Sequence, residues 1–201
     1  MRPAIVTRGL RWTTMPALLV DAHRRAAAIL SDAGVPDPSV DAELLIGHVL
    51  GIGRGAVQAA AIRGDALSGE DQAALEALVH RRAGREPLQH LTGTAPFRHL
   101  VLAVGPGVFV PRPETEIVAQ FAIDALLAAA TPEPIGVDLC TGSGAIALAL
   151  ATEVPHARVY AVELSPEAHA WAQCNTAGQE NLTLVLGDLA EELGDLDGTV
   201  D

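Results

Sequence analysis

The sequence contains no lysine, so all 13 of its positively charged residues are arginines. This absence excludes the phosphate-binding lysine of a P-loop, Schiff-base chemistry and lysine general bases. Only two cysteines occur, Cys140 and Cys174, and their spacing fits neither a metal knuckle nor a disulfide framework. The seven histidines include no pair at the spacing of metal ligands. We therefore expect reduced thiols and no metal site.

Long hydrophobic runs are also missing, because no stretch reaches the roughly 18 consecutive apolar residues of a membrane span. Residues 1–14 carry three arginines without a following apolar run, which is not the pattern of a signal peptide. The 201 residues are 49% hydrophobic and 19% charged, a composition typical of globular domains. We expect a cytoplasmic protein of one or two domains that does not bind a membrane.

Basic residues are scarce in the second half of the chain. Residues 1–85 hold ten arginines and nine acidic residues, which gives a formal charge of +1. Residues 86–201 hold three arginines and sixteen acidic residues, which gives −13 and accounts for the net charge of −12. So acidic a region repels phosphate backbones, and direct binding of nucleic acid is not expected.

The first half of the chain has the periodicity of helices. Apolar residues recur at helical spacing over residues 18–34, and similar patterns follow over residues 37–50 and 68–84. An aspartate and a proline predict the start of the second helix, and glycines end the first and third. We interpret residues 16–85 as a helical bundle. Such a bundle either docks a partner or is a plain cap on a catalytic domain.

The pattern changes from residue 86 onward. Short strand-like segments at residues 91–94 and 99–104, flanked by glycine and proline, predict a β-hairpin linker over residues 86–112. From residue 113 helical and strand patterns alternate, which indicates a parallel sheet flanked by helices. The expected strands of this sheet are residues 135–139, 159–163 and 182–186. The second half of the chain is therefore predicted to be an α/β domain.

The sharpest motif joins an apolar strand to a helix through a glycine turn, in the order Val137-Asp138-Leu139-Cys140-Thr141-Gly142-Ser143-Gly144-Ala145-Ile146-Ala147. Glycines let the backbone approach a ligand closely, and amides at a helix start can donate hydrogen bonds to it. The same spacing formally satisfies the dinucleotide fingerprint of nicotinamide enzymes. On the turn alone, a nicotinamide cofactor therefore remains an alternative ligand.

Acidic residues end or follow the next two strands. Glu163, about 20 residues beyond the turn, is placed to accept hydrogen bonds from both hydroxyls of a ribose. Its alternative is a solvated acid before the helix cap Ser165-Pro166. Asp188 is either an acceptor for the amino group of adenine, with Leu189 beside the ring, or a surface acid. Asp138, Glu163 and Asp188 are predicted to surround one crevice, because the carboxyl ends of parallel strands share an edge.

Three segments, in this order and spacing, resemble the HemK/PrmC family. They are Arg85-Glu86-Pro87-Leu88-Gln89-His90-Leu91-Thr92-Gly93, Phe109-Val110-Pro111-Arg112-Pro113-Glu114-Thr115-Glu116, and Asp138-Leu139-Cys140-Thr141-Gly142-Ser143-Gly144-Ala145-Ile146-Ala147-Leu148-Ala149. The second segment is the most specific, because class I methyltransferases in general share the glycine turn. The resemblance covers about residues 16–201. It implies a helical N-terminal domain, a hairpin linker and a Rossmann-like class I methyltransferase domain over residues 113–201.

The resemblance also implies a function. The family uses S-adenosylmethionine to methylate the side-chain amide of a glutamine in peptide chain release factors. The cofactor-binding residues that it implies are Pro111, Asp138, Cys140, Thr141, Gly142, Ser143, Gly144, Glu163, Asp188 and Leu189. Because the family often has glycine where Cys140 stands, Cys140 is expected to contribute only its backbone and its size. The alternative of a reactive thiol has no histidine beside it in sequence.

One motif of the family is missing. Its Asn-Pro-Pro-Tyr motif follows a fourth strand, and Asp201 stands where that strand would begin. In the family this motif orients the substrate amide toward the methyl sulfonium, so that catalysis is mostly positioning. We therefore assign no catalytic residue and expect a truncated, inactive polypeptide. Two alternatives remain, a non-catalytic binding fragment and an NAD-dependent dehydrogenase, although the chain has no candidate hydride-transfer domain.

Overall fold

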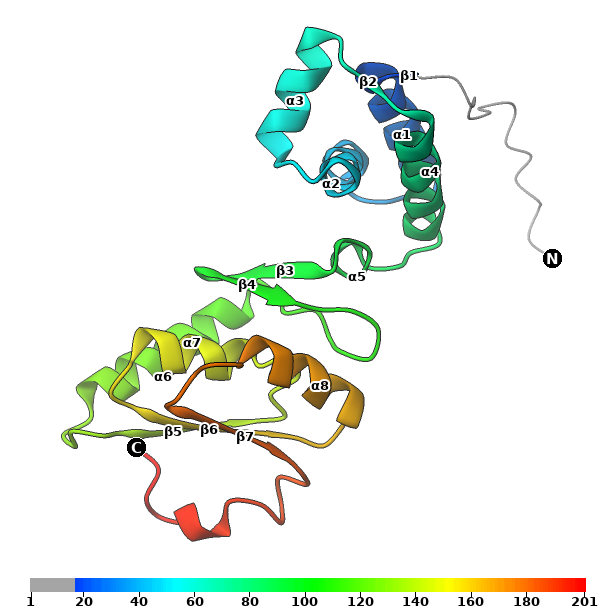
Figure 1. The fold of residues 1–201 in the computed structure, drawn as a ribbon. Helices are drawn as coiled ribbons and strands as arrows, with labels where there is room; N and C mark the ends of the chain where they lie inside the picture. Colours follow the sequence, from blue (N-terminus) through cyan, green and yellow to red (C-terminus); the bar gives the residue numbers. More distant parts are fainter. Residues whose placement is uncertain (1–16) are drawn as a thin grey trace. The chain divides into compact units, whose positions relative to one another are not determined.

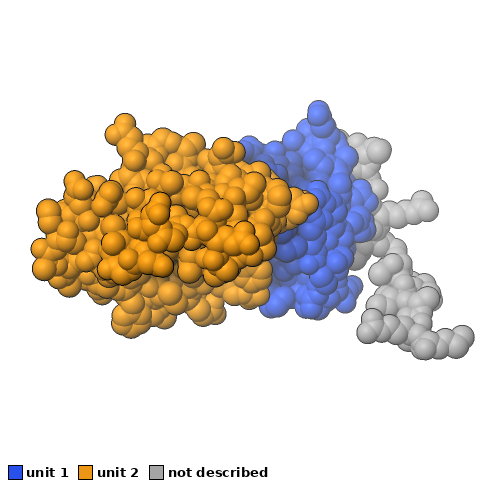
Figure 2. Space-filling view, turned by 90° about the horizontal axis from the view of Figure 1, so that it is seen from below, with its two compact units in different colours: residues 1–92 blue, residues 93–201 orange. Residues whose placement is uncertain are grey.

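The computed structural model describes residues 17–201, and the chain divides into two compact units (Figure 2). Unit 1 comprises residues 1–92 and unit 2 comprises residues 93–201. The prediction for residues 1–14 and the first residue of the predicted helical domain lie outside the described residues. The assignment of residues 86–112 as a linker stays a prediction.

Unit 1 is a bundle of helices built around α2. Its helices are α1 (Leu19–Asp32), α2 (Pro38–Leu50), α3 (Arg54–Arg63), α4 (Gly69–Ala83) and α5 (Leu88–Thr92). Two short strands, β1 (Ala17–Leu18) and β2 (Ala66–Leu67), pair antiparallel. Helix α2 packs against all four other helices. The predicted helical bundle is confirmed, and the start of α2 at a proline is confirmed with it.

The core of unit 1 is apolar. Leu30, Leu45 and Leu75, from three different helices, are fully buried at its centre. Among residues 17–201 no single helix is long and apolar enough to cross a membrane. The pair α2 and α3, bent by 90°, satisfies length and composition together. Since α2 contributes several buried residues to this core, we interpret the pair as core helices.

One local prediction in unit 1 is wrong, and one helix was not predicted. Helix α3 lies between Gly53 and Gly64, in a segment for which the sequence analysis makes no prediction. Residues 91–94 were expected to begin a strand, but Leu91 lies in helix α5. The carbonyl of Pro87 accepts the amides of both His90 and Leu91, which forms a helical turn. Burial of Leu91 in the core of unit 1 stabilises this short helix.

Unit 2 contains a hairpin followed by alternating helices and strands (Figure 1). The hairpin pairs β3 (Thr94–Phe97) with β4 (Leu100–Ala103). The remaining elements are α6 (Thr115–Ala128), β5 (Ile135–Leu139), α7 (Ala145–Glu153), β6 (Arg158–Glu163), α8 (Pro166–Asn175), β7 (Leu182–Leu186) and the 3₁₀ helix η1 (Gly194–Leu196). Strands β5, β6 and β7 form a parallel sheet in that order. The predicted hairpin and Rossmann-like alternation are confirmed.

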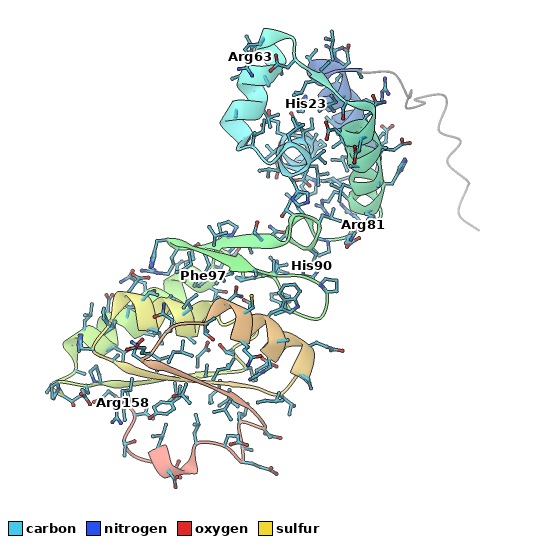
Figure 3. The ribbon with its side chains drawn as sticks, viewed as in Figure 1. His23, Arg63, Arg81, His90, Phe97 and Arg158 are labelled. Carbon is cyan, nitrogen blue, oxygen red and sulfur yellow. The ribbon has the colours of Figure 1, made fainter. Side chains whose placement is uncertain are left out.

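The core of unit 2 has two layers. Figure 1 shows α6, α7 and α8 between the hairpin and the sheet. One apolar cluster lies between hairpin and helices and includes Phe97, which is buried (Figure 3). A second cluster lies between the helices and the sheet and includes Leu150 and Val159. Helix α7 contacts both clusters, and its alternating alanines leave room for packing on two sides.

Candidate cofactor-binding site

The turn after β5 has the backbone that the glycines predicted. Gly142 and Gly144 have φ angles of 61° and 80°, in the left-handed region that glycine adopts without steric cost. Cys140 has a φ of 62°, which is uncommon for a residue with a side chain. This conformation is one that glycine adopts without steric cost, which gives a physical reason for the glycine that the resemblance implies at this position. The Cys140 side chain itself is exposed.

Asp138 links the end of β5 to the turn and to the first turn of α7. Its Oδ2 accepts hydrogen bonds from the Thr141 hydroxyl at 2.6 Å and from the Ala147 amide at 3.1 Å. Burial raises the pKa of Asp138, these two bonds oppose the rise, and the neighbouring Glu163 carboxylate adds to it. The bonds described for Asp138 thus lie within the protein, and its direct contact with a cofactor stays a prediction.

Glu163 lies against the glycine turn. The Gly142 amide donates to its Oε2 at 2.8 Å, and the Ser165 amide donates to its Oε1 at 2.9 Å. The residue is 9% exposed. A carboxylate has about four acceptor positions, so two remain for hydroxyl groups of a ligand. The structure therefore brings together the first two predicted parts of the site, the turn and the acid of the second strand.

Open space borders the turn at Gly142. A Cβ atom placed on Gly142 would meet no heavy atom within 4 Å, whereas one on Gly144 would meet Thr176 Cγ2 at 3.3 Å. Glycine at position 144 therefore suits the close approach of α8 as well as the positive φ. At position 142 packing against the protein imposes no such requirement, and a ligand can approach the backbone there.

Asp188 and Leu189 follow β7 and are both exposed. The Asp188 Oδ1 accepts the Ala190 amide at 2.9 Å, so the carboxylate caps its own turn. Gly187, the preceding residue, donates its amide to the Glu163 carbonyl at 3.0 Å. This bond places Asp188 at the same edge of the sheet as Glu163. Its proposed contact with adenine and its alternative as a surface acid both remain compatible with this position.

Apolar side chains at the carboxyl ends of the strands were not singled out from the sequence. Leu139 ends β5, Leu164 follows β6 and Leu186 ends β7, and they are between 49% and 66% exposed. Leu189 is 47% exposed and lies just beyond β7. Their shared signal is an apolar residue where a buried strand stops.

The loop before α6 carries the remaining predicted site residue, Pro111, which is half-buried. In this loop the Arg112 guanidinium lies 5.1 Å from the centroid of the Phe109 ring, a cation–π contact. Phe109 itself is 67% exposed. Closure of this loop over the site, and contact of Pro111 with a cofactor, stay predictions.

Other features of the described chain do not compete with this site. No group of three or more potential metal ligands occurs among residues 17–201. An open hollow of about 460 Å³ lies at the opposite, amino ends of the strands and includes Arg158 (Figure 3). It has neither a glycine turn nor an acid buried at a strand end, so we place the candidate site at the carboxyl ends.

The strand, glycine turn and helix, with a buried acid ending the next parallel strand, define a Rossmann-like domain of the class I methyltransferase type. Residues 137–201 match the family model described as a methyltransferase domain. Among solved structures, a precorrin-6y C5,15-methyltransferase from Geobacter metallireducens is 21% identical with a TM-score of 0.38. That match covers 47% of this chain and 49% of the other, and its low score supports no further comparison.

Residues 21–93 match the PrmC N-terminal domain model. The chain is 50% identical to the release factor glutamine methyltransferase of Streptomyces coelicolor, over 92% of this chain and 63% of that protein. The proteins of that name from Bifidobacterium longum and Mycolicibacterium smegmatis are 44% and 50% identical, over 92% and 88% of this chain. Over most of its length the chain is thus similar to the HemK/PrmC family. It spans 66% and 60% of the latter two relatives.

Proposed function

We propose that this chain acts as part of an S-adenosylmethionine-dependent enzyme that methylates a glutamine side chain in peptide chain release factors. The names of its relatives support the reaction and the substrate. The observation that carries the cofactor assignment is the hydrogen bond from the Gly142 amide to Glu163. It joins the turn and the ribose-binding acid into one site with unused acceptor positions.

The residues of the site fit S-adenosylmethionine in three respects. Two free acceptor positions on Glu163 suit the two ribose hydroxyls. The open space at Gly142 suits a ligand that lies against the backbone. The exposed leucines suit adenine, and the negative charge of residues 86–201 favours a cationic sulfonium. When bound, the cofactor would supply the methyl group, and the turn and Glu163 would hold it in a fixed orientation.

Calorimetry distinguishes this cofactor from the nicotinamide alternative. The chain is titrated with S-adenosylmethionine, with S-adenosylhomocysteine and with NAD. We expect binding of the first two and weaker or undetectable binding of NAD, because the matched family model and the relatives are methyltransferases. Binding of NAD with comparable or higher affinity would remove the methyltransferase proposal.

The helical unit is proposed to dock the release factor. Residues 1–85 carry a formal charge of +1, whereas the rest of the chain carries −13, so the two parts attract different surfaces. Deletion of residues 1–84 from a version extended to the length of the relatives should reduce methylation of an intact release factor far more than that of a glutamine peptide. Equal losses would make the bundle a stabilising cap. A substrate of the translation apparatus also favours a cytoplasmic location.

A further inference from the structure

We propose that Asn175 is a positioning residue of the cofactor site, because its side-chain amide joins the glycine turn to the last residue of β4. Asn175 ends α8 and lies outside all the sequence motifs that define the site. The proposal rests on the proposed function only in taking residues 140–144 as the cofactor-binding turn. Its geometric content is independent of which cofactor binds.

The Asn175 amide uses its oxygen and its nitrogen on two separate backbone segments. The Ala103 amide donates to Asn175 Oδ1 at 2.7 Å, and Asn175 Nδ2 donates to the Ala103 carbonyl at 2.9 Å. Nδ2 also donates to the Ser143 carbonyl at 2.9 Å. The side chain therefore pairs with Ala103 as a neighbouring strand would, and its second N–H reaches the turn. Among side chains of this length, only an amide has one acceptor and two donors on a single group.

The bond to Ser143 fixes a peptide plane inside the turn. The peptide that joins Ser143 to Gly144 has its N–H bonded to the Thr141 carbonyl at 2.9 Å. Its oxygen is the one that accepts from Asn175. Both the N–H and the carbonyl of this peptide are thus hydrogen-bonded. Gly144 has a φ of 80° and, as a glycine, could adopt other backbone conformations, so these two bonds oppose a flip of the peptide. The orientation of the turn amides depends on this restraint.

Helix α8 also packs directly against the turn. A Cβ atom on Gly144 would meet Thr176 Cγ2 at 3.3 Å and the Cα and Cβ of Ala172 at 3.6 Å. Ala172 and Thr176 flank Asn175 at the end of the helix. The hydrogen bond from Asn175 therefore acts across a closely packed contact between α8 and the turn.

The loop after β4 is held by the same helix. A Cβ atom on Gly105 would lie 2.5 Å from the Trp171 ring, and Trp171 Nε1 donates to the Pro106 carbonyl at 3.0 Å. Gly107, with a φ of 89°, lies against Glu167 in the same way. This loop leads to the segment that is predicted to close over the cofactor. Asn175 thus connects the glycine turn to the end of β4, where the loop begins that leads to the segment predicted to close over the cofactor.

The first test compares Asn175 with a matched asparagine. Asn181 Nδ2 also donates to two carbonyls, those of Ala151 and Ala157, at 3.0 and 3.1 Å, away from the turn. We expect Asn175→Ala to weaken S-adenosylhomocysteine binding about tenfold, and Asn181→Ala to leave it within about twofold. Thermal unfolding shows whether the two variants lose similar stability. Unchanged affinity in Asn175→Ala, or equal losses in both variants, would overturn the proposal.

A second variant and a second measurement keep the proposal testable if Asn175→Ala does not fold or if the protein does not bind the ligand. Asn175→Asp keeps the acceptor for the Ala103 amide but loses both donors, so we expect it to weaken binding as the alanine variant does. Hydrogen exchange needs no ligand: loss of the Asn175 bonds should speed exchange at residues 141–144 and at Ala103. In the wild type, the ligand should slow exchange at both places. Exchange at 141–144 that is unaffected by the substitutions contradicts the proposal, whereas a wild type that binds no S-adenosyl ligand contradicts the proposed function alone.

Discussion

The two units keep their buried polar side chains in different places. In unit 1 the described ones are Asp41, which pairs with Arg82 at 2.7 Å across α2 and α4, and Gln72. In unit 2 they are Asp138, Thr141, Ser143, Glu163 and Thr176. All five of the latter lie in the glycine turn or against it. Unit 1 thus buries polar groups singly in an apolar bundle, whereas unit 2 gathers them at one edge of its sheet.

This difference separates stability from ligand affinity. Burial of apolar surface is the main favourable contribution to folding, and unit 1 is built mostly from it. A cluster of buried polar groups contributes little net stability but holds a fixed geometry when every member is bonded. Substitutions in unit 1 should therefore change the free energy of unfolding. Substitutions at the turn of unit 2 should change ligand affinity in addition to stability.

The largest effect is expected from Leu75→Ala in unit 1. Leu75 is fully buried, so removal of its side chain should lower the free energy of unfolding by about 2–5 kcal/mol. Urea denaturation followed by circular dichroism measures this loss. Ile62→Ala is the control, because Ile62 is 88% exposed and the change should stay within about 0.5 kcal/mol. A loss of cofactor affinity in the folded Leu75→Ala protein would break the separation of the two units.

Glu163→Ala is the matching change in unit 2. It leaves the Gly142 and Ser165 amides without an acceptor and removes the proposed ribose contact, so cofactor binding should weaken by about 1–3 kcal/mol. Calorimetry with S-adenosylhomocysteine measures the change. Glu180→Ala, at an exposed acid of the same unit, should leave the affinity unchanged. If Glu163→Ala also leaves it unchanged, Glu163 is not a ligand-binding residue.

Local sequence patterns predicted the parallel sheet and most helices because these elements carry their own periodicity, whereas the two-residue strands β1 and β2 were not predicted. The glycine turn could be predicted for the same reason, since its residues are contiguous. Helix α3 and the helical turn at Leu91 could not, because packing against the rest of unit 1 decides their conformation. Asn175 could not be found either, because its partners lie 72 and 32 residues away along the chain. Contacts of that kind leave no periodic signal.

Helix caps allow a smaller, symmetrical test of the two units. Helix α4 of unit 1 begins after Ser68, whose hydroxyl accepts the Asp71 amide at 3.1 Å. Helix α8 of unit 2 begins after Ser165, whose hydroxyl accepts the Ala168 amide at 3.3 Å. Replacement of either serine by alanine should cost about 1 kcal/mol of stability, measured by urea denaturation.

The two caps should differ in their effect on cofactor affinity. Because α8 carries Asn175 and follows Glu163, Ser165→Ala should also weaken cofactor binding, whereas Ser68→Ala should not. Equal affinities in the two variants would show that the start of α8 does not contribute to the site.

The smallest effect, and the one specific to the buried cluster, is the pH dependence of Asp138→Asn. Ion-paired acids in both units have lowered pKa values: the Arg81 hydrogen bond lowers that of Glu86, and the Arg98 hydrogen bond lowers that of Glu153. Their contribution to stability is lost as the pH falls. The pKa shift of Asp138 has the opposite sign, because burial raises its pKa above the ordinary value of 3.8.

A raised folded-state pKa means that the folded protein holds the Asp138 proton more tightly than the unfolded chain does. Protonation of Asp138 makes its full contribution to the free energy of unfolding at a pH below the ordinary pKa. This contribution is lost as the pH rises through the raised pKa of the folded protein. Asparagine can still accept from Thr141 and Ala147, carries no charge and removes the repulsion of Glu163. As the pH rises from 4, the free energy of unfolding of the variant should therefore increase relative to that of the wild type. At higher pH the difference between the two proteins should stay constant. Urea denaturation of both proteins between pH 4 and 8 gives this difference, in which all other ion pairs cancel. A wild type that gains on the variant with rising pH would show that the site, like unit 1, is stabilised by its charge.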